Sequence, residues 1–283
     1  MIALPPSSLD RRDFAPPATN PPVAVAGAII DLDGTVYRDG ALLPGADRAI
    51  ERLQDRDVET LFVSNNPTKP PEGYAADLRN LGIDVDPGSV LTAGIVTQEY
   101  LEASHADDRI YLVGEESLRE QLESFTLVVD PTAADVVLAS IDRSFTYDRL
   151  WEVSRAFQEA DPAFVGTDPD RLIPVSEDEL APGSGAIIGA IAATVGREPD
   201  PMLGKPSPET AGAVADRLEA DPAGCVVVGD RLDTDIALGD RLKARTVLVR
   251  TGAHTEADLP DHDVTPDHII DSLGDLPDVL ESG

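Results

Sequence analysis

An apolar stretch close to the N-terminus ends in two carboxylates, and this feature constrains the fold more than any other. Residues 23–30 are typical of a buried β-strand, and Asp31 and Asp33 follow it directly, with Gly34 next in the chain. Aspartate is disfavoured in strands, and burying its charge is costly unless a partner offsets it. Because residues i and i+2 of an extended segment project to the same side, both carboxylates can face one centre. The pair therefore predicts a strand whose carboxyl end carries a polar site.

Downstream of this stretch, strand-like and helix-like segments alternate along the chain. Such alternation is typical of α/β folds with a parallel sheet. We expect further strands at 58–63, 110–113, 135–139, 163–166, 225–228 and 246–250. We expect helices at 44–56, 72–81, 92–103, 115–124, 147–160, 185–195, 207–219 and 234–242.

Polar residues follow three of these strands, at 31–33, 64–66 and 229–230. In open α/β sheets, ligands bind beyond the carboxyl ends of the strands, so the three clusters converge if the strands are neighbours. The middle third of the chain has no such acid cluster at a strand end, which predicts an inserted second domain. We therefore expect a doubly wound parallel-sheet core at 23–103 and 199–283, with an α/β domain at 104–198 inserted into it.

The charge balance is strongly acidic, with 53 acidic residues against 22 lysines and arginines and a net charge of −31. This charge disfavours nucleic acid and anionic membrane as partners, although it is compatible with a cationic partner. Since the acids are spread along the whole chain, we interpret them as a solvated, halophilic surface adapted to molar salt. At about 1 M salt the screening length is only ~3 Å, so this surface would hardly repel an anionic substrate. The lysines are restricted to Lys69, Lys205 and Lys243, which makes each of them informative.

The N-terminal region, residues 1–22, is rich in proline and is expected to be a flexible leader. Its Asp10–Phe14 segment superficially resembles a twin-arginine export signal. Cleavage after the apolar stretch that follows would remove the strand that carries the aspartates, so we expect a cytoplasmic protein. The single cysteine, Cys225, fits a reducing compartment and is interpreted as a small core residue. No apolar run approaches the roughly 20 residues that span a bilayer, so no membrane segment is expected.

The residues in the three polar clusters suit phosphate chemistry. Two adjacent carboxylates need a cation, and Mg²⁺ is a hard ion that is held by carboxylates together with substrate phosphate. One carboxylate of the Asp31/Asp33 pair could attack as a nucleophile while the other transfers protons. Asp230 could add a carboxylate to the metal site, Ser64 could donate a hydrogen bond to a phosphoryl oxygen, and Lys205 could neutralise the phosphoryl group.

These residues occur in the order of a known set of motifs. Asp31–Thr35, Ser64–Asn66, Lys205 and Gly229–Asp235 together resemble the four motifs of the haloacid dehalogenase (HAD) superfamily of phosphohydrolases. The long segment between the second and third motifs is similar to the branch of that superfamily with a large α/β cap. Within this segment, Asp142–Tyr147 and Phe164–Asp170 resemble the subgroup of NagD, 4-nitrophenylphosphatase and phosphoglycolate phosphatase.

The resemblance implies a role for each residue that matches a motif. Asp31 would be the nucleophile that forms an aspartyl-phosphate. Asp33 would protonate the leaving alcohol and later activate water. Ser64, Asn65 and Lys205 would bind the transferring phosphoryl group.

The resemblance also implies a Mg²⁺ cofactor. The ion would be held by the Asp31 carboxylate, the Asp33 backbone carbonyl and Asp230. Asp235 would support this site close to Lys205.

Other segments have simpler interpretations beside functional ones. Thr167 and Asp168 lie on the cap segment expected to face the substrate, although the family often has asparagine where this chain has Asp168. Pro182–Gly185 is either a helix entry loop or a phosphate cradle, and we favour the loop. Asp233 could cap the helix that follows it, so it is left out of the predicted site. Three histidines match no standard metal spacing and are interpreted as part of a solvated region near the C-terminus: His254, His262 and His268.

The function that these residues predict is Mg²⁺-dependent hydrolysis of small phosphomonoesters, with a small phosphorylated metabolite as the partner. Phosphoglycolate, glycerol phosphate, a sugar phosphate and a nucleotide are all compatible with the sequence. The alternatives are a phosphomutase that returns the phosphoryl group to a sugar, a receiver-like signalling domain and a non-catalytic binding protein. The cap-like segments favour hydrolysis over the mutase, and Asp33 argues against the receiver because an acid/base group speeds loss of the phosphoryl group. Caps of this family can also mediate homodimers.

Overall fold

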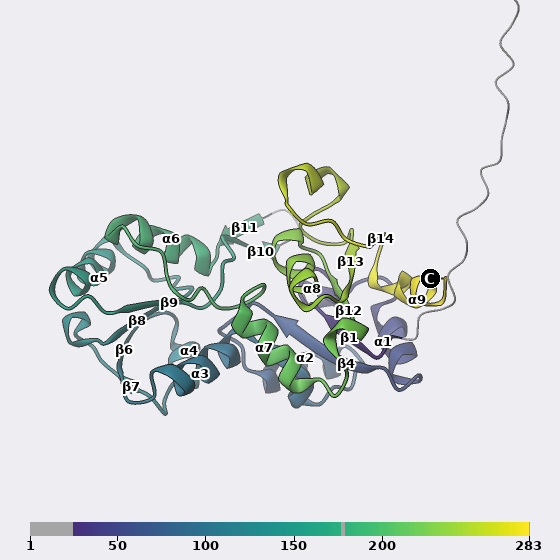
Figure 1. Cartoon of the computed structure of the whole chain (residues 1–283), viewed down its shortest axis with the longest axis horizontal. Coiled ribbons are helices and arrows are strands. Elements are labelled where there is room, and N and C mark those ends of the chain that lie inside the picture. The colour runs from purple at the N-terminus through teal and green to yellow at the C-terminus, as the bar shows by residue number, and fades with distance from the viewer. Residues whose placement is uncertain (1–24, 177–178, 283) are drawn as a thin grey trace, which may run out of the picture.

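The computed structural model describes residues 25–176 and 179–282, so the predicted leader at 1–22 lies outside the described part. The described chain forms two lobes, each built on a parallel β-sheet (Figure 1). We call the lobe that contains both ends of the described chain the core, and the other lobe the cap. Among the described residues, no helix is both long enough and apolar enough to cross a membrane.

The core is built around a six-stranded sheet in the order β14–β13–β12–β1–β4–β5. All neighbouring strands in it are parallel, and Ile29 of β1 pairs with Leu61 on one side and Val227 on the other. The strands are β1 (Gly27–Ile30), β4 (Glu59–Ser64), β5 (Val90–Thr92), β12 (Val226–Gly229), β13 (Arg245–Val249) and β14 (His268–Ile270). The chain moves outward from β1 to β5 and later returns to β12 on the other side. The order of the strands therefore reverses next to β1, where open α/β sheets bind their ligands.

Helices cover both faces of the core sheet. One face packs against α1 (Ala46–Gln54), α2 (Pro71–Asn80) and α9 (Leu276–Ser282). The other face packs against α3 (Ala93–Ser104), α7 (Pro208–Arg217) and α8 (Ala237–Leu242). Along β1 the two faces alternate, since Ala28 and Ile30 belong to the first cluster and Ile29 to the second. The predicted doubly wound α/β fold is therefore confirmed, and burial on both faces explains why the strands are continuous apolar runs.

The cap contains a four-stranded parallel sheet in the order β7–β6–β8–β9. Its elements are β6 (Arg109–Val113), α4 (Glu116–Gln121), β7 (Thr126–Leu127), β8 (Val136–Ala139), α5 (Tyr147–Glu159), β9 (Ala163–Gly166) and α6 (Ser184–Val195). One face of this sheet packs against α5 and α6, and the other joins a hydrophobic cluster that continues through α3 to the core sheet. The cap is thus inserted between α3 and α7, as predicted (Figure 1). We propose 104 and 198 as its limits.

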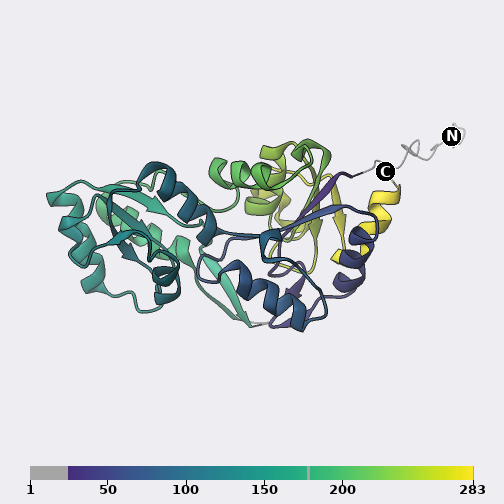
Figure 2. The ribbon, with the colours of Figure 1, turned by 90° about the horizontal axis from the view of Figure 1, so that it is seen from below.

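Two hairpins and several short turns complete the described elements. The hairpins pair β2 (Tyr37–Arg38) with β3 (Ala41–Leu42), and β10 (Leu172–Ser176) with β11 (Glu179–Pro182). In Figure 2 the second hairpin, drawn in teal, reaches from the cap toward the core. Short 3₁₀ turns lie at Pro87–Ser89, Pro131–Ala133, Pro222–Gly224, Glu256–Asp261 and Leu273–Asp275, and a π-helical turn lies at Leu232–Ile236.

The strands that the sequence pattern did not predict are short. β2, β3, β5, β7 and β14 have two or three residues each, which is too short for a periodic signal, and β10 and β11 each contain a proline, which argues against a strand. The interpretation of the C-terminal region as solvated was wrong at His268. This residue lies in β14 and pairs with Val247 of β13, and Ile270 of the same strand is buried in the core cluster. This part of the C-terminal region therefore forms an edge strand of the core sheet.

Candidate active site

The polar clusters predicted from the sequence meet at the carboxyl ends of adjacent core strands. Asp31 follows β1, Ser64 ends β4 and Asp230 follows β12. β1 is hydrogen-bonded to both β4 and β12, so the three positions lie side by side at one edge. Lys205, which lies far from them in sequence, reaches the same edge.

Lys205 is the centre of a buried ion network. The residue is 3% exposed, and Nζ donates to Asp31 Oδ1 at 2.6 Å, to Asp235 Oδ1 at 2.7 Å and to the Val63 carbonyl at 2.9 Å. Burial alone would lower the pKa of Lys205, but Asp235 and Asp31 outweigh it and raise that pKa above its ordinary value. The ammonium therefore stays charged, and each of its three protons is donated to one of these three oxygens.

Asp31 is held at both carboxylate oxygens. Besides the bond from Lys205, Oδ2 accepts a hydrogen bond from Thr35 Oγ1 at 3.0 Å. Burial raises the pKa of Asp31, while Lys205 opposes this effect. The orientation of the carboxylate is thus fixed before any substrate binds.

Asp33 has a different environment from Asp31. Its side chain reaches solvent, yet the protein packed around the carboxylate raises its pKa against the opposing effects of Lys69 and Lys205. A hydrogen bond from Tyr37 also reaches this carboxylate. A carboxyl group with a raised pKa and access to solvent can exchange protons with a leaving group or with water.

A divalent cation fits the carboxylates beside Lys205. Oxygen atoms of Asp31, Asp230 and Asp235 all lie within 4.8 Å of one another. Asp235 is already satisfied, since Oδ1 accepts from Lys205 and Oδ2 accepts from the Arg231 N–H at 3.1 Å. Asp230 is 5% exposed, and burial together with Asp31 and Asp235 raises its pKa well above the ordinary value. A hard cation held by Asp31 and Asp230 would offset this excess of negative charge.

Two glycines make room for the Asp230 carboxylate. A Cβ at Gly34, which has a φ of +89°, would lie 2.6 Å from Asp230 Oδ2, and a Cβ at Gly252 would lie 1.9 Å from it. Oδ2 accepts a hydrogen bond from Ala253 N at 2.7 Å. The backbone thus packs directly around this carboxylate, which explains the glycine after Asp33.

Ser64 is the last residue of β4, and Asn65 begins the loop that follows it. Ser64 Oγ accepts a hydrogen bond from Asn66 N at 3.2 Å and lies 3.0 Å from the Tyr74 hydroxyl. The Asn65 side chain accepts from the Lys205 N–H at 2.6 Å and donates to the Lys205 carbonyl at 3.3 Å. The Asn65 amide therefore positions Lys205, and its predicted contact with phosphate stays a prediction.

Thr167 and Asp168 follow the last cap strand, β9. Both side chains are buried, and Thr167 Oγ1 lies 3.0 Å from both Ser140 Oγ and Asp168 Oδ2. The Thr167 hydroxyl is thus bonded inside the cap, and its contact with substrate also stays a prediction. Burial and the neighbouring Asp170 raise the pKa of Asp168 to about 8. The expectation that no acids cluster at a strand end in the middle third was therefore wrong.

Asp168→Asn should raise the thermal stability of the protein at alkaline pH. Asp168 ionises above about pH 4 in the unfolded chain but only above about pH 8 in the folded protein. The free energy of unfolding therefore falls as the pH rises between these two values. Asparagine does not titrate, so the two proteins should melt at similar temperatures near pH 4. At pH 8.5 the variant should melt more than about 3 °C higher in scanning calorimetry at constant salt. A difference that does not vary with pH would contradict the assignment.

The structure brings further residues to this region that the sequence analysis missed. Asp170 accepts from Asn65 Nδ2 at 3.3 Å and lies 4.0 Å from Arg231 Nη2, so it links the cap to two core loops. Arg231 also pairs with Asp233 at 2.8 Å, which replaces the predicted capping role of that aspartate. Asp170 lies in the segment Phe164–Asp170 and Arg231 in Gly229–Asp235, but their sequence positions carry no signal of what they contact.

The loop Pro182–Gly185 and the histidines His254 and His262 make contacts that stabilise the fold. Ser184 opens α6 and its Oγ accepts from Ile141 N at 3.1 Å, so Pro182–Gly185 acts as a helix entry loop. His254 Nδ1 accepts from Leu232 N at 2.9 Å, and its ring centroid lies 4.7 Å from that of His262. His254 therefore holds the loop after Asp230 through the Leu232 N–H, and His262 packs against its ring. The interpretation of these two histidines as solvated was wrong.

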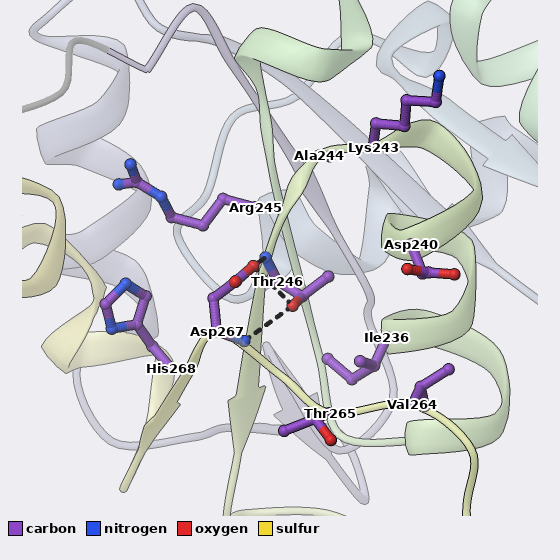
Figure 3. Close-up of a pocket in the computed structure, with 10 residues that line it drawn as sticks. All are labelled: Ile236, Asp240, Lys243, Ala244, Arg245, Thr246, Val264, Thr265, Asp267 and His268. Atoms are coloured by element: carbon purple, nitrogen blue, oxygen red, sulfur yellow. Dashed lines mark hydrogen bonds between the residues drawn. The ribbon is translucent and has the colours of Figure 1, made fainter.

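A cavity of about 660 Å³ lies away from the carboxylates, at the amino ends of β13 and β14. In Figure 3 the side chains of Lys243 and Arg245 point away from each other across it. Asp267 is occupied by hydrogen bonds from the N–H and hydroxyl of Thr246, at 2.8 and 3.0 Å. The polar groups do not converge, in contrast to those around Lys205.

Comparison with known proteins identifies the family of this chain. Residues 28–127 match the model of haloacid dehalogenase-like hydrolases, and residues 202–276 match a second HAD-hydrolase-like model. An acid sugar phosphatase of Staphylococcus haemolyticus is 33% identical over 248 residues, which is 87% of this chain and 93% of that protein. The chain therefore belongs to the haloacid dehalogenase-like hydrolase family.

Solved structures place the chain more closely within this family. The p-nitrophenyl phosphatase from Archaeoglobus fulgidus has a TM-score of 0.81 and 32% identity, with 90% of this chain and 99% of that chain covered. NagD from E. coli K-12 has a TM-score of 0.77 and 26% identity, with 88% and 97% covered. The chain is a phosphoric monoester hydrolase of the NagD type, as the sequence motifs predicted.

Proposed function

We propose that this protein hydrolyses small phosphomonoesters through an aspartyl-phosphate at Asp31, with Mg²⁺ as the cofactor. The observation that carries the proposal is the geometry of Lys205, whose ammonium is bonded to Asp31 and Asp235 at 2.6 and 2.7 Å. A positive charge held against a carboxylate at the end of the central strand would offset the repulsion between that carboxylate and a phosphate.

The proposed reaction has two steps. An Asp31 carboxylate oxygen attacks phosphorus, and the bond from phosphorus to the ester oxygen breaks while Asp33 gives that oxygen a proton. Asp33 then takes a proton from water, which attacks the phosphorus of the acyl phosphate and returns Asp31 as a carboxylate. The raised pKa of Asp33 supports its role as the acid of the first step.

The metal in this proposal would be held by the Asp31 carboxylate, the Asp33 backbone carbonyl and Asp230. When bound, Mg²⁺ would neutralise charge that develops on the phosphoryl oxygens. Asp235 would stay hydrogen-bonded to Lys205 and would hold that ammonium beside Asp31. Ser64 would donate a hydrogen bond to a phosphoryl oxygen.

Asp230→Asn should raise the Mg²⁺ concentration needed for half-maximal hydrolysis of 4-nitrophenyl phosphate by at least about 10-fold, because a negatively charged ligand is lost. The wild type should lose activity when Mg²⁺ is removed by EDTA, and added Mg²⁺ should raise its melting temperature. That thermal shift should be smaller in the variant.

The exposed Asp240 lies outside the carboxylate group and offers a matched control. Asp240→Asn should keep the Mg²⁺ dependence of the wild type. Full activity of the wild type in excess EDTA would contradict the metal assignment.

The substrate class is proposed from the relatives. Besides the acid sugar phosphatase, a protein named dihydroxyacetone phosphatase from Corynebacterium glutamicum is 29% identical over 88% of this chain. We therefore propose small phosphorylated sugars and related metabolites as substrates. Release of inorganic phosphate from a panel of sugar phosphates, glycerol phosphate, phosphoglycolate and nucleotides in molar salt tests this. Isomer formation without phosphate release would instead indicate a mutase, and a long-lived phosphorylated Asp31 would indicate a receiver.

A further inference from the structure

A buried tyrosine lies directly behind Ser64. Tyr74 of α2 is 1% exposed, and its hydroxyl lies 3.0 Å from Ser64 Oγ. The proposed reaction steps and metal site do not use this hydroxyl. A buried phenol hydroxyl needs a hydrogen-bond partner, and this bond joins it to a residue proposed to contact phosphate.

The direction of the bond between Tyr74 and Ser64 follows from the proposed contact of Ser64 with phosphate. The two hydroxyl oxygens lie 3.0 Å apart, and either of them can donate to the other. A serine hydroxyl has a single proton, so a Ser64 that donates to a phosphoryl oxygen cannot also donate to Tyr74. In that state the Tyr74 hydroxyl is the donor to Ser64.

In that state both lone pairs of Ser64 Oγ accept hydrogen bonds. The oxygen accepts from Asn66 N at 3.2 Å, and it would accept from the Tyr74 hydroxyl, which lies 3.0 Å away. A serine hydroxyl has two lone pairs and one proton, so only the proton is left. That proton can be donated only away from Tyr74 and Asn66.

The Tyr74 phenol stays protonated, and its ring is held by a neighbouring cation. Burial and the Asp33 carboxylate raise the pKa of Tyr74, so the phenol stays a donor across the neutral range. The Lys69 ammonium lies 4.5 Å from the centre of the ring, a distance at which a cation and an aromatic face attract each other.

We propose that Tyr74 is a positioning residue that orients the Ser64 hydroxyl as a donor to a phosphoryl oxygen. This inference rests on the proposed function, in which Ser64 contacts phosphate. A donor whose oxygen is held by neighbouring hydrogen bonds needs less reorientation during the reaction. Without the phenol hydroxyl, Ser64 Oγ loses one of these bonds, so its proton points to the phosphoryl oxygen for only part of the time.

The test is a double-mutant cycle measured with 4-nitrophenyl phosphate in saturating Mg²⁺. Tyr74→Phe should reduce kcat/KM about 5- to 10-fold, with a similar weakening of competitive inhibition by inorganic phosphate. In the Ser64→Ala background the same substitution should change kcat/KM by less than about twofold, because the two residues act through one bond. Tyr111→Phe removes a buried cap hydroxyl that donates to Glu152, and as the control it should match the wild type.

Two results would overturn the inference: wild-type kinetics in Tyr74→Phe, or equal losses with and without Ser64. If Tyr74→Phe does not fold, Asn66→Ala removes the side-chain bond to Tyr74 and keeps the backbone bond to Ser64. Its loss should be about 2- to 5-fold and should also vanish in the Ser64→Ala background. An inactive wild type would contradict the proposed function and this inference together, whereas an active wild type with an additive cycle contradicts this inference alone.

Discussion

Asp31→Asn should abolish phosphatase activity, with kcat for 4-nitrophenyl phosphate reduced by at least about 10⁴-fold. A neutral amide is a poor nucleophile and cannot form the acyl phosphate. Its oxygen can still accept from Lys205 and its nitrogen can donate to Thr35, so the local structure should survive. The measurement is steady-state hydrolysis in molar salt with Mg²⁺, together with the melting temperature.

The control for this variant is Asp107→Asn, which alters an exposed aspartate in the turn before β6. It should leave kcat and the melting temperature unchanged. Acid quenching of the wild type during turnover should trap phosphate on the protein, and Asp31→Asn should trap none. Wild-type turnover in Asp31→Asn would place the nucleophile elsewhere.

Lys205→Met should reduce both activity and stability. The substitution leaves Asp31 and Asp235 buried without their shared cation, and breaking such a buried ion network costs about 3–5 kcal/mol of unfolding free energy. Activity should fall by at least about 10²-fold, because the positive charge that we propose to face the phosphoryl group is lost. Urea unfolding at constant salt measures the first effect, and phosphate release by the folded variant measures the second.

Lys243→Met provides the matched control, because Lys243 is exposed and lines the cavity at the opposite end of the strands. That variant should keep the stability and turnover of the wild type. A Lys205→Met protein as stable as the wild type would show that the carboxylates are compensated by another group.

The parts of the fold that the sequence predicts are those with a strong local signal. The strand before Asp31 is a continuous apolar run that ends in charged residues, and the structure confirms it as β1, which lies between β12 and β4 in the sheet. The short edge strand β14 carries a histidine and follows an acidic region, so its pattern is indistinguishable from a loop. Its formation depends on pairing with β13, which only the assembled sheet provides.

Some residues of the candidate site could be predicted from the sequence, and others could not. Asp31, Ser64 and Asp230 could be predicted to meet because each follows a strand, and parallel strands end at one edge. Tyr74 could not be recognised, since on α2 it matches the apolar pattern of a core-facing residue together with Leu78. The role of Asn65 was also hidden, because its partner Lys205 arrives from the far side of the cap insertion. Tertiary contacts between distant segments leave no periodic mark in the sequence.

The pairing of β1 with β12 has a consequence for the order in which the protein is made. Ala28 pairs with Val226, roughly 200 residues further along the chain, whereas the cap strands pair within residues 109–166. Contacts between nearby segments form faster than those that close a long loop. During synthesis the cap sheet can therefore assemble on the ribosome while β1 still lacks one neighbour. Asp31 meets Lys205 and Asp230 only after the chain beyond Asp230 has emerged, so shorter chains lack the assembled group of carboxylates around Lys205.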